Sequence, residues 1–163
     1  MSHDAPAIFI ALEHSHFAAA IRQSGWLYPA ANVGHIISLV IFASAVAVMD
    51  VRLLGGFAAI APARLIDQAR WFAVAALVGM AATGFMLLAA EASHLALNPM
   101  FQIKAMLVAA GLANAALYEF WLRPTLKEIA PGVPIPSRAR TAAVFSIGIW
   151  LAVAACGRSI AYF

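Results

Sequence analysis

The chain is poor in the residues on which soluble domains and many metal centres depend. It has one cysteine, Cys156, among 163 residues, and only 10% of the residues are charged. One cysteine excludes a disulfide within the chain and a Cys-rich zinc or iron–sulfur site. A soluble domain carries about a quarter of its residues as charges. The scarcity of charge therefore argues against a soluble globular protein.

Familiar catalytic and nucleotide-binding motifs are also lacking. The sequence contains no Walker motif, glycine-rich dinucleotide loop, HExxH or nucleophile elbow. The formal net charge is +3, but the basic residues form no stripe of the kind that follows phosphates. We therefore expect no nucleic-acid partner. Hydrolytic catalysis is disfavoured, and whether the protein is an enzyme at all stays open.

Long hydrophobic runs are what the chain has in abundance. The sequence is 64% hydrophobic, with a mean hydropathy of +0.90. A helix needs about 20 mostly apolar residues to cross a bilayer. Four stretches meet this requirement, at about 26–49, 71–90, 101–122 and 141–157. The pattern predicts an all-α, integral membrane protein with a four-helix transmembrane bundle over residues 26–163.

Residues 1–25 precede the first span and have a different pattern. Apolar and polar side chains alternate there at helical spacing. The apolar ones are Ile8, Phe9 and Leu12, and the polar ones are Glu13, His16 and Arg22. Such a segment is typical of an amphipathic helix that lies on the membrane surface. We therefore expect an interfacial helix over residues 1–25, in contact with membrane lipid.

Turn-forming residues separate the spans. Residues 50–70 predict a loop with a short helix, and Asn98 followed by Pro99 marks the start of the third span. Pro124 is expected to end the third helix. Ser137 is the predicted N-cap of the last helix.

The basic residues predict how the chain is oriented. Most of them follow the first and third spans, namely Arg52, Arg64, Arg70, Arg123, Lys127, Arg138 and Arg140. The opposite side has only Arg22, Lys104 and Arg158. By the positive-inside rule the first group faces the cytoplasm. We expect a bacterial inner (plasma) membrane protein with several spans and with both termini in the periplasm.

His35 lies deep within the first predicted span. An ionisable side chain inside a membrane is costly, so such a residue is a candidate functional site. A helical rise of 1.5 Å per residue places His35 about 5 Å to the outer side of the bilayer centre, and Met86 and Met106 about 7 Å on that side. Lys104 and Arg158 come out nearer the surface by the same count.

This layer of side chains is consistent with two cofactors. Imidazole and thioether groups bind b-type haem, and the same atoms bind Cu(I). Three basic residues would then pair with haem propionates or another anion, namely Lys104, Arg158 and Arg22. In the simpler interpretation the methionines only fill space, and His35 forms a hydrogen bond to a neighbouring helix.

A second group of histidines lies before the first span. His14 and His16 are two residues apart, so on a helix they point to different sides and chelate a metal poorly. If that segment is not helical, they become candidate metal ligands together with His35.

Several short motifs together resemble an uncharacterised family of small bacterial inner-membrane proteins with four spans. They are Leu12-Glu13, residues 22–29 (RQSGWLYP), His35, residues 50–55 (DVRLLG), Asn98-Pro99 with Phe101 and Lys104, and residues 157–162 (GRSIAY). The plan is also loosely similar to copper-resistance D membrane proteins and to small cytochrome b bundles. Those likenesses imply copper handling or haem-based electron transfer, although architecture does not determine function.

Three functions remain open at this stage. The first is a b-type haem protein that carries electrons between quinol and a periplasmic acceptor. The second is a copper-handling protein with a periplasmic copper partner. The third is a cofactor-free assembly or anchor subunit of a membrane complex. The many Ala and Gly residues in the spans also favour a homo-oligomer, because small residues let helices approach closely.

Overall fold

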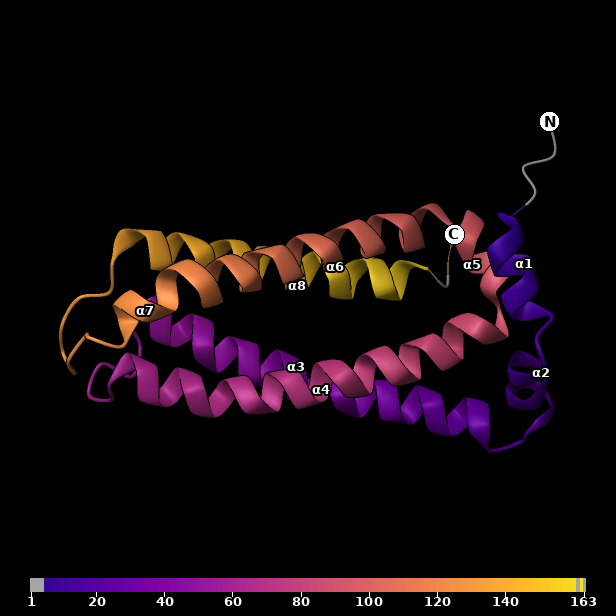
Figure 1. The fold of residues 1–163 in the computed structure, drawn as a ribbon, viewed down its shortest axis with the longest axis horizontal. Helices are drawn as coiled ribbons and strands as arrows, with labels where there is room; N and C mark the ends of the chain where they lie inside the picture. The colour runs from indigo at the N-terminus through magenta and orange to yellow at the C-terminus, as the bar shows by residue number, and fades with distance from the viewer. Residues whose placement is uncertain (1–4, 161, 163) are drawn as a thin grey trace.

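The computed structural model describes residues 5–160 and 162, and these form an all-α bundle without a strand (Figure 1). Its long helices are α3 (Leu27–Leu53), α4 (Pro62–Ala90), α6 (Pro99–Leu117) and α8 (Ser137–Ser159). Helix α3 pairs with α4, and α6 pairs with α8. The two hairpins then meet mainly through α3 and α8. The predicted four-helix bundle is confirmed.

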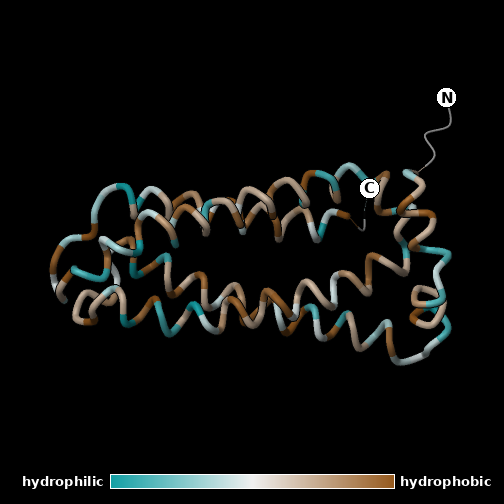
Figure 2. The backbone as a smooth tube through the Cα atoms, viewed as in Figure 1, coloured by the Kyte–Doolittle hydropathy of each residue, from teal (hydrophilic) through white to brown (hydrophobic). Residues whose placement is uncertain are grey.

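Each long helix is able to cross a membrane. Helix α6 continues through η1 (Tyr118–Leu122) and α7 (Arg123–Leu126), so the third apolar stretch has 28 residues. Even the shortest stretch, α8, has 23 residues, or about 34 Å of helix. Apolar residues line the length of the helices, while polar residues gather at both ends (Figure 2). The protein is therefore a multi-pass membrane protein.

Three short helices gather at one end of the bundle, which we call the terminal end (Figure 1). They are α1 (Ala7–Glu13), α2 (His16–Gln23) and α5 (Ala92–Leu97). The expected single surface helix is thus divided in two. The break lies at Ser15, whose side chain caps α2 by accepting a hydrogen bond from the backbone N–H of Ala18.

Polar contacts attach these short helices to the bundle. Glu13 Oε2 accepts a hydrogen bond of 2.7 Å from the backbone N–H of Ser93. Hydrogen bonding to Ser93 holds the pKa of the Glu13 carboxyl below its usual value, because the bond favours the charged form. Arg22 donates to the carbonyl of Ala90, at the end of α4. The segment is therefore anchored to the connection between the second and third spans.

Helix α4 begins earlier than the sequence predicts. It starts at Pro62, which occupies the first turn, so the expected loop over residues 50–70 shrinks to residues 54–61. Arg52 closes this loop by donating from Nε to the carbonyl of Ile60 at 3.1 Å. The polar residues Asp67 and Arg70 are helical because both find partners on the neighbouring hairpin.

The proline and capping predictions had mixed outcomes. Asn98 does start α6, since its Oδ1 accepts hydrogen bonds from the backbone N–H groups of Met100 and Phe101. Pro124 does not end the third helix. It falls in the first turn of α7, where a missing N–H is tolerated. Ser137 is the first residue of α8 rather than its N-cap.

Candidate functional site

His35 forms a hydrogen bond within its own hairpin. Its Nδ1 lies 3.0 Å from Thr83 Oγ1 on α4. The Thr83 hydroxyl itself donates to the carbonyl of Gly79 at 2.7 Å, so it accepts from His35. Nδ1 therefore has the proton, and Nε2 keeps a free lone pair. A hydrogen bond from His35 to a neighbouring helix, the simpler of the two sequence interpretations, is present.

The other residues of the predicted cofactor set have different surroundings. Met106 is 65% exposed and lies on the outer surface of the bundle, whereas Met86 is half-buried. Lys104 extends toward α8, where a Cβ added to Gly157 would lie 3.5 Å from its Nζ. Arg158 lies over the ring of Tyr162.

The predicted metal and anion ligands at the terminal end are not gathered. Arg22 binds backbone carbonyl groups, and the exposed His14 and His16 lie on the two sides of the break at Ser15. Among residues 5–160 and 162 no group of three His, Cys, Asp or Glu residues is placed to hold a metal ion. Haem and copper binding stay predictions.

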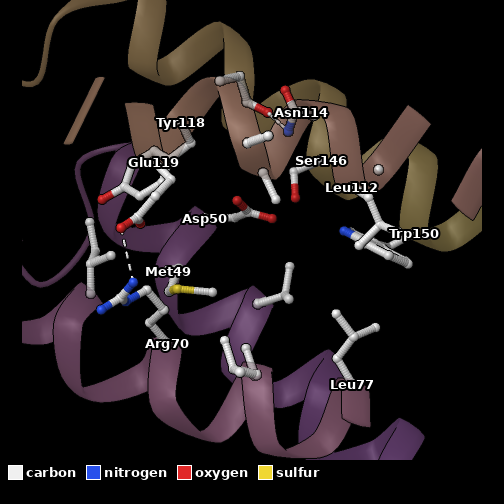
Figure 3. A pocket seen from close by; sticks show the side chains of 18 of the residues that line it. Met49, Asp50, Arg70, Leu77, Leu112, Asn114, Tyr118, Glu119, Ser146 and Trp150 are labelled. Carbon is white, nitrogen blue, oxygen red and sulfur yellow. Dashed lines mark hydrogen bonds and ion pairs between the residues drawn. The ribbon is translucent and has the colours of Figure 1, made fainter. Parts of the chain in front are cut away.

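A cavity of about 350 Å³ lies between the two hairpins, near the end that holds residues 54–61 and 127–136, which we call the loop end. Most of its wall is apolar (Figure 3). The apolar lining includes Phe42, Val46, Met49, Leu53, Ile66, Leu77, Leu112 and Trp150. Pockets for small molecules combine such a wall with a few polar groups. The cavity therefore has the size and character of a site for a small lipophilic molecule.

Asp50 is the polar group that distinguishes this cavity. The residue is only 5% exposed, and its Oδ2 atom is buried without a hydrogen-bond partner. Its carboxylate points toward the hydroxyl of Ser146 on α8 (Figure 3). None of the ion pairs within residues 5–160 and 162 includes Asp50. A buried carboxylate with an unpartnered oxygen and no basic partner is costly, and in a membrane protein it is a candidate functional group.

An ion-pair network borders the cavity at the loop end. Arg70 Nη1 lies 3.0 Å from Glu119 Oε1, and this pair is part of the cavity wall (Figure 3). Glu119 also pairs with Arg123, which reaches Asp67 at 2.9 Å. Two carboxylates and two guanidinium groups thus neutralise one another. Asp50 remains the carboxylate of the cavity without a basic partner.

The π-helix η1 places Glu119 and Tyr118 in this wall. Compared with a continuous α-helix, a π-helix turns the side chains that follow it around the helix axis by part of a turn. Such segments occur frequently at functional sites. Glu119 and Arg123 are four residues apart and form an ion pair. Glu119 has a second partner, Arg70 on α4.

An aromatic pair closes the far side of the cavity. The rings of Phe42 and Trp150 meet edge to face, with centroids 4.6 Å apart. Gly111 on α6 makes room for the indole, because a Cβ there would lie 2.8 Å from Trp150 Cζ2. The shape of this wall therefore depends on a glycine.

Sequence reasoning missed the cavity and the place of Asp50 in it. The available signal was an acidic residue that follows directly on an uninterrupted apolar run. That signal is ambiguous, because an aspartate in such a position usually reaches water.

The fold and the buried carboxylate define a helical multi-pass membrane protein with a largely apolar cavity between its two hairpins. Within that class, the chain belongs to DUF6644, a family of unknown function whose model matches residues 9–163. Membership of an uncharacterised family is thereby confirmed. Neither a curated protein nor a solved structure matches the chain.

Proposed function

We infer that the protein binds a small lipophilic molecule inside the membrane, in the cavity between the two hairpins. The observation that carries this proposal is the buried Oδ2 of Asp50, which has no partner beside a cavity of about 350 Å³. A ligand with a hydrogen-bond donor would supply the missing partner. Its apolar body would fill the space between the helices.

The surroundings of the cavity are consistent with this role. Its wall is formed by residues of α3, α4, α6, η1 and α8, so a ligand would bind both hairpins at once. The outer faces of the helices expose many large apolar side chains, so such a molecule would enter from the surrounding lipid. A membrane quinol, which has an apolar tail and hydroxyl donors, belongs to this class of ligand.

Fluorescence of Trp150 tests the proposal. The other tryptophans, Trp26, Trp71 and Trp121, are at least 70% exposed and are replaced by Phe to leave Trp150 as the sole fluorophore. We expect 4-bromobenzyl alcohol to quench Trp150 along a saturable curve. A matched chain with Trp26 as its sole tryptophan measures partition of the probe into detergent and should show only a linear decrease. Linear quenching of both chains would refute the proposal.

A second candidate function follows from the orientation of His35. Metal-binding histidines usually donate their other ring N–H to an acceptor that orients the ring, as Nδ1 does to Thr83. Nε2 of His35 would then hold a b-type haem, which would supply electron transfer when bound. Copper is the alternative metal.

An absorption spectrum with metal analysis tests this second candidate. A Soret band that sharpens on reduction with dithionite and is lost in His35→Ala would support haem. Bound copper that is lost in the same variant would support copper handling. A purified protein with neither would leave the cavity as the functional site.

A further inference from the structure

We propose that the ligand of the cavity is a lipophilic cation, a protonated amine or a quaternary ammonium, whose charged end lies beside Asp50. This inference rests on the proposed function and specifies its substrate class. It is carried by the balance of charge in the cavity wall, by the chemistry of the polar lining, and by the aromatic side chains of the wall.

The charges of the cavity wall leave one negative charge without a counter-ion. Asp50, Arg70 and Glu119 are the lining residues with acidic or strongly basic side chains. Glu119 is bound to Arg70, and Arg123 behind it is bound to Asp67. The guanidinium groups of Arg70 and Arg123 therefore each have an acidic partner, while that of Arg52, outside the lining, donates to the carbonyl of Ile60. The uncompensated charge is that of Asp50, and a cationic ligand is the occupant that neutralises it.

The polar lining beside Asp50 has little to offer an anion. Ser146 faces the carboxylate (Figure 3), and the amide N–H of Asn114 already donates to the carbonyl of Ala142 at 3.2 Å. An anionic ligand would meet the Asp50 charge without a free guanidinium group to offset it. A bare metal ion would have one carboxylate and no cluster of further acidic, His or Cys ligands among the described residues.

Aromatic rings and aliphatic side chains form the rest of the wall. Trp150, Phe42 and Tyr118 line the cavity together with Leu77 and Leu112. Ring faces attract cations, and Trp is the strongest of them. A bulky organic cation satisfies both parts of the cavity, because its charge reaches the carboxylate while its apolar groups contact the rings.

The inference is tested with two probes of the same shape that differ in one charge. They are (4-bromobenzyl)trimethylammonium and its neutral isostere, 1-bromo-4-neopentylbenzene, each titrated into the sole-Trp150 chain. We expect saturable quenching by both, with the cation binding about tenfold or more tightly. That ratio corresponds to ion pairing in a partly desolvated site, because the quaternary nitrogen of the probe has no hydrogen to donate.

Asp50→Asn and Glu91→Gln form a matched pair of variants. Both remove one negative charge from the protein, but Glu91 is exposed at the terminal end, outside the cavity. Asp50→Asn should weaken binding of the cation about tenfold or more and leave binding of the neutral isostere unchanged. The unchanged isostere shows that the variant still folds. Glu91→Gln should alter neither affinity.

The outcomes separate this inference from the proposed function. Equal binding of both probes, with no effect of Asp50→Asn, would overturn the cation assignment and keep the cavity as a site for neutral lipophilic molecules. Linear quenching by both probes would overturn the cation assignment and the proposed function together.

Discussion

Replacement of Gly111 by Ala is the sharpest test of the cavity wall. A Cβ at this position would lie 2.8 Å from Trp150 Cζ2 and 3.1 Å from Cε2. Contacts as short as the first do not occur between real atoms, so the indole must move. The movement also disturbs the edge-to-face contact of Trp150 with Phe42. The variant therefore tests whether α6 and α8 pack as closely as the structure shows.

The expected magnitude follows from three opposing effects. Overpacking of a close contact costs about 1–3 kcal/mol, and weakening of an aromatic pair costs up to about 1.5 kcal/mol. Alanine is favoured over glycine within a helix by about 1 kcal/mol. We therefore expect Gly111→Ala to lower the free energy of unfolding by about 1–2 kcal/mol.

Unfolding by SDS in mixed micelles, followed by circular dichroism, measures this change. Gly148→Ala on α8 is the matched control, because a Cβ there meets nothing within 4 Å. We expect the control to be neutral or to stabilise the protein by up to about 1 kcal/mol.

A double-mutant cycle then assigns the loss to the indole. Trp150→Phe removes the atoms with which the new Cβ would collide. In that background Gly111→Ala should no longer destabilise the protein, so the two substitutions are coupled. If Gly111→Ala destabilises both backgrounds equally, or behaves like Gly148→Ala in the native one, the packing argument is wrong.

Three further predictions concern polar contacts. Glu119→Gln should lower the free energy of unfolding by about 1 kcal/mol, since two partly exposed ion pairs are lost. Added salt should reduce this stability difference between the two chains, and a difference insensitive to salt would contradict its electrostatic origin. Thr83→Val should remove the acceptor of His35 Nδ1 and so change the tautomer ratio of the imidazole ring, which its ¹⁵N chemical shifts report. An unchanged tautomer ratio would show that Thr83 does not orient the ring of His35. The lowered pKa of Glu13 means that its bond to Ser93 stabilises the fold above the ordinary carboxyl pKa of about 4.5 and is lost as the pH falls through the lower, folded value. Exchange protection of the Ser93 amide, corrected for its intrinsic rate, should therefore decrease on acidification in the native chain but not in Glu13→Gln, and equal behaviour of the two chains would exclude Glu13 as the titrating group.

Local signals in the sequence predicted some helix boundaries and failed at others. Asn98 before Pro99 predicted the start of α6, because an N-cap acts on backbone groups two and three residues away. Pro124 failed as a helix end, because a proline forbids only the hydrogen bond of its own nitrogen. In this chain η1 and α7 accommodate that loss and continue the apolar stretch to Leu126.

The start of α4 was missed for a different reason. Asp67 and Arg70 are polar, and polar residues between two spans suggest a loop. Their partners, Arg123 and Glu119, lie about fifty residues further along the chain. Pairs so distant in sequence leave no periodic pattern by which to recognise them.

Composition and hydropathy by themselves determined that this chain crosses a membrane with four helices, because a bilayer requires long apolar helices and the sequence has four runs of that length. They also pointed to His35, since an ionisable residue in mid-span is conspicuous in a single sequence. Only the tertiary structure decided which polar groups meet. It turned Nδ1 of His35 toward Thr83, paired Arg70 with Glu119, and left Oδ2 of Asp50 without a hydrogen-bond partner beside the cavity. The physical reason is that burial and pairing depend on how the two hairpins pack, and that packing joins side chains from helices far apart in the sequence.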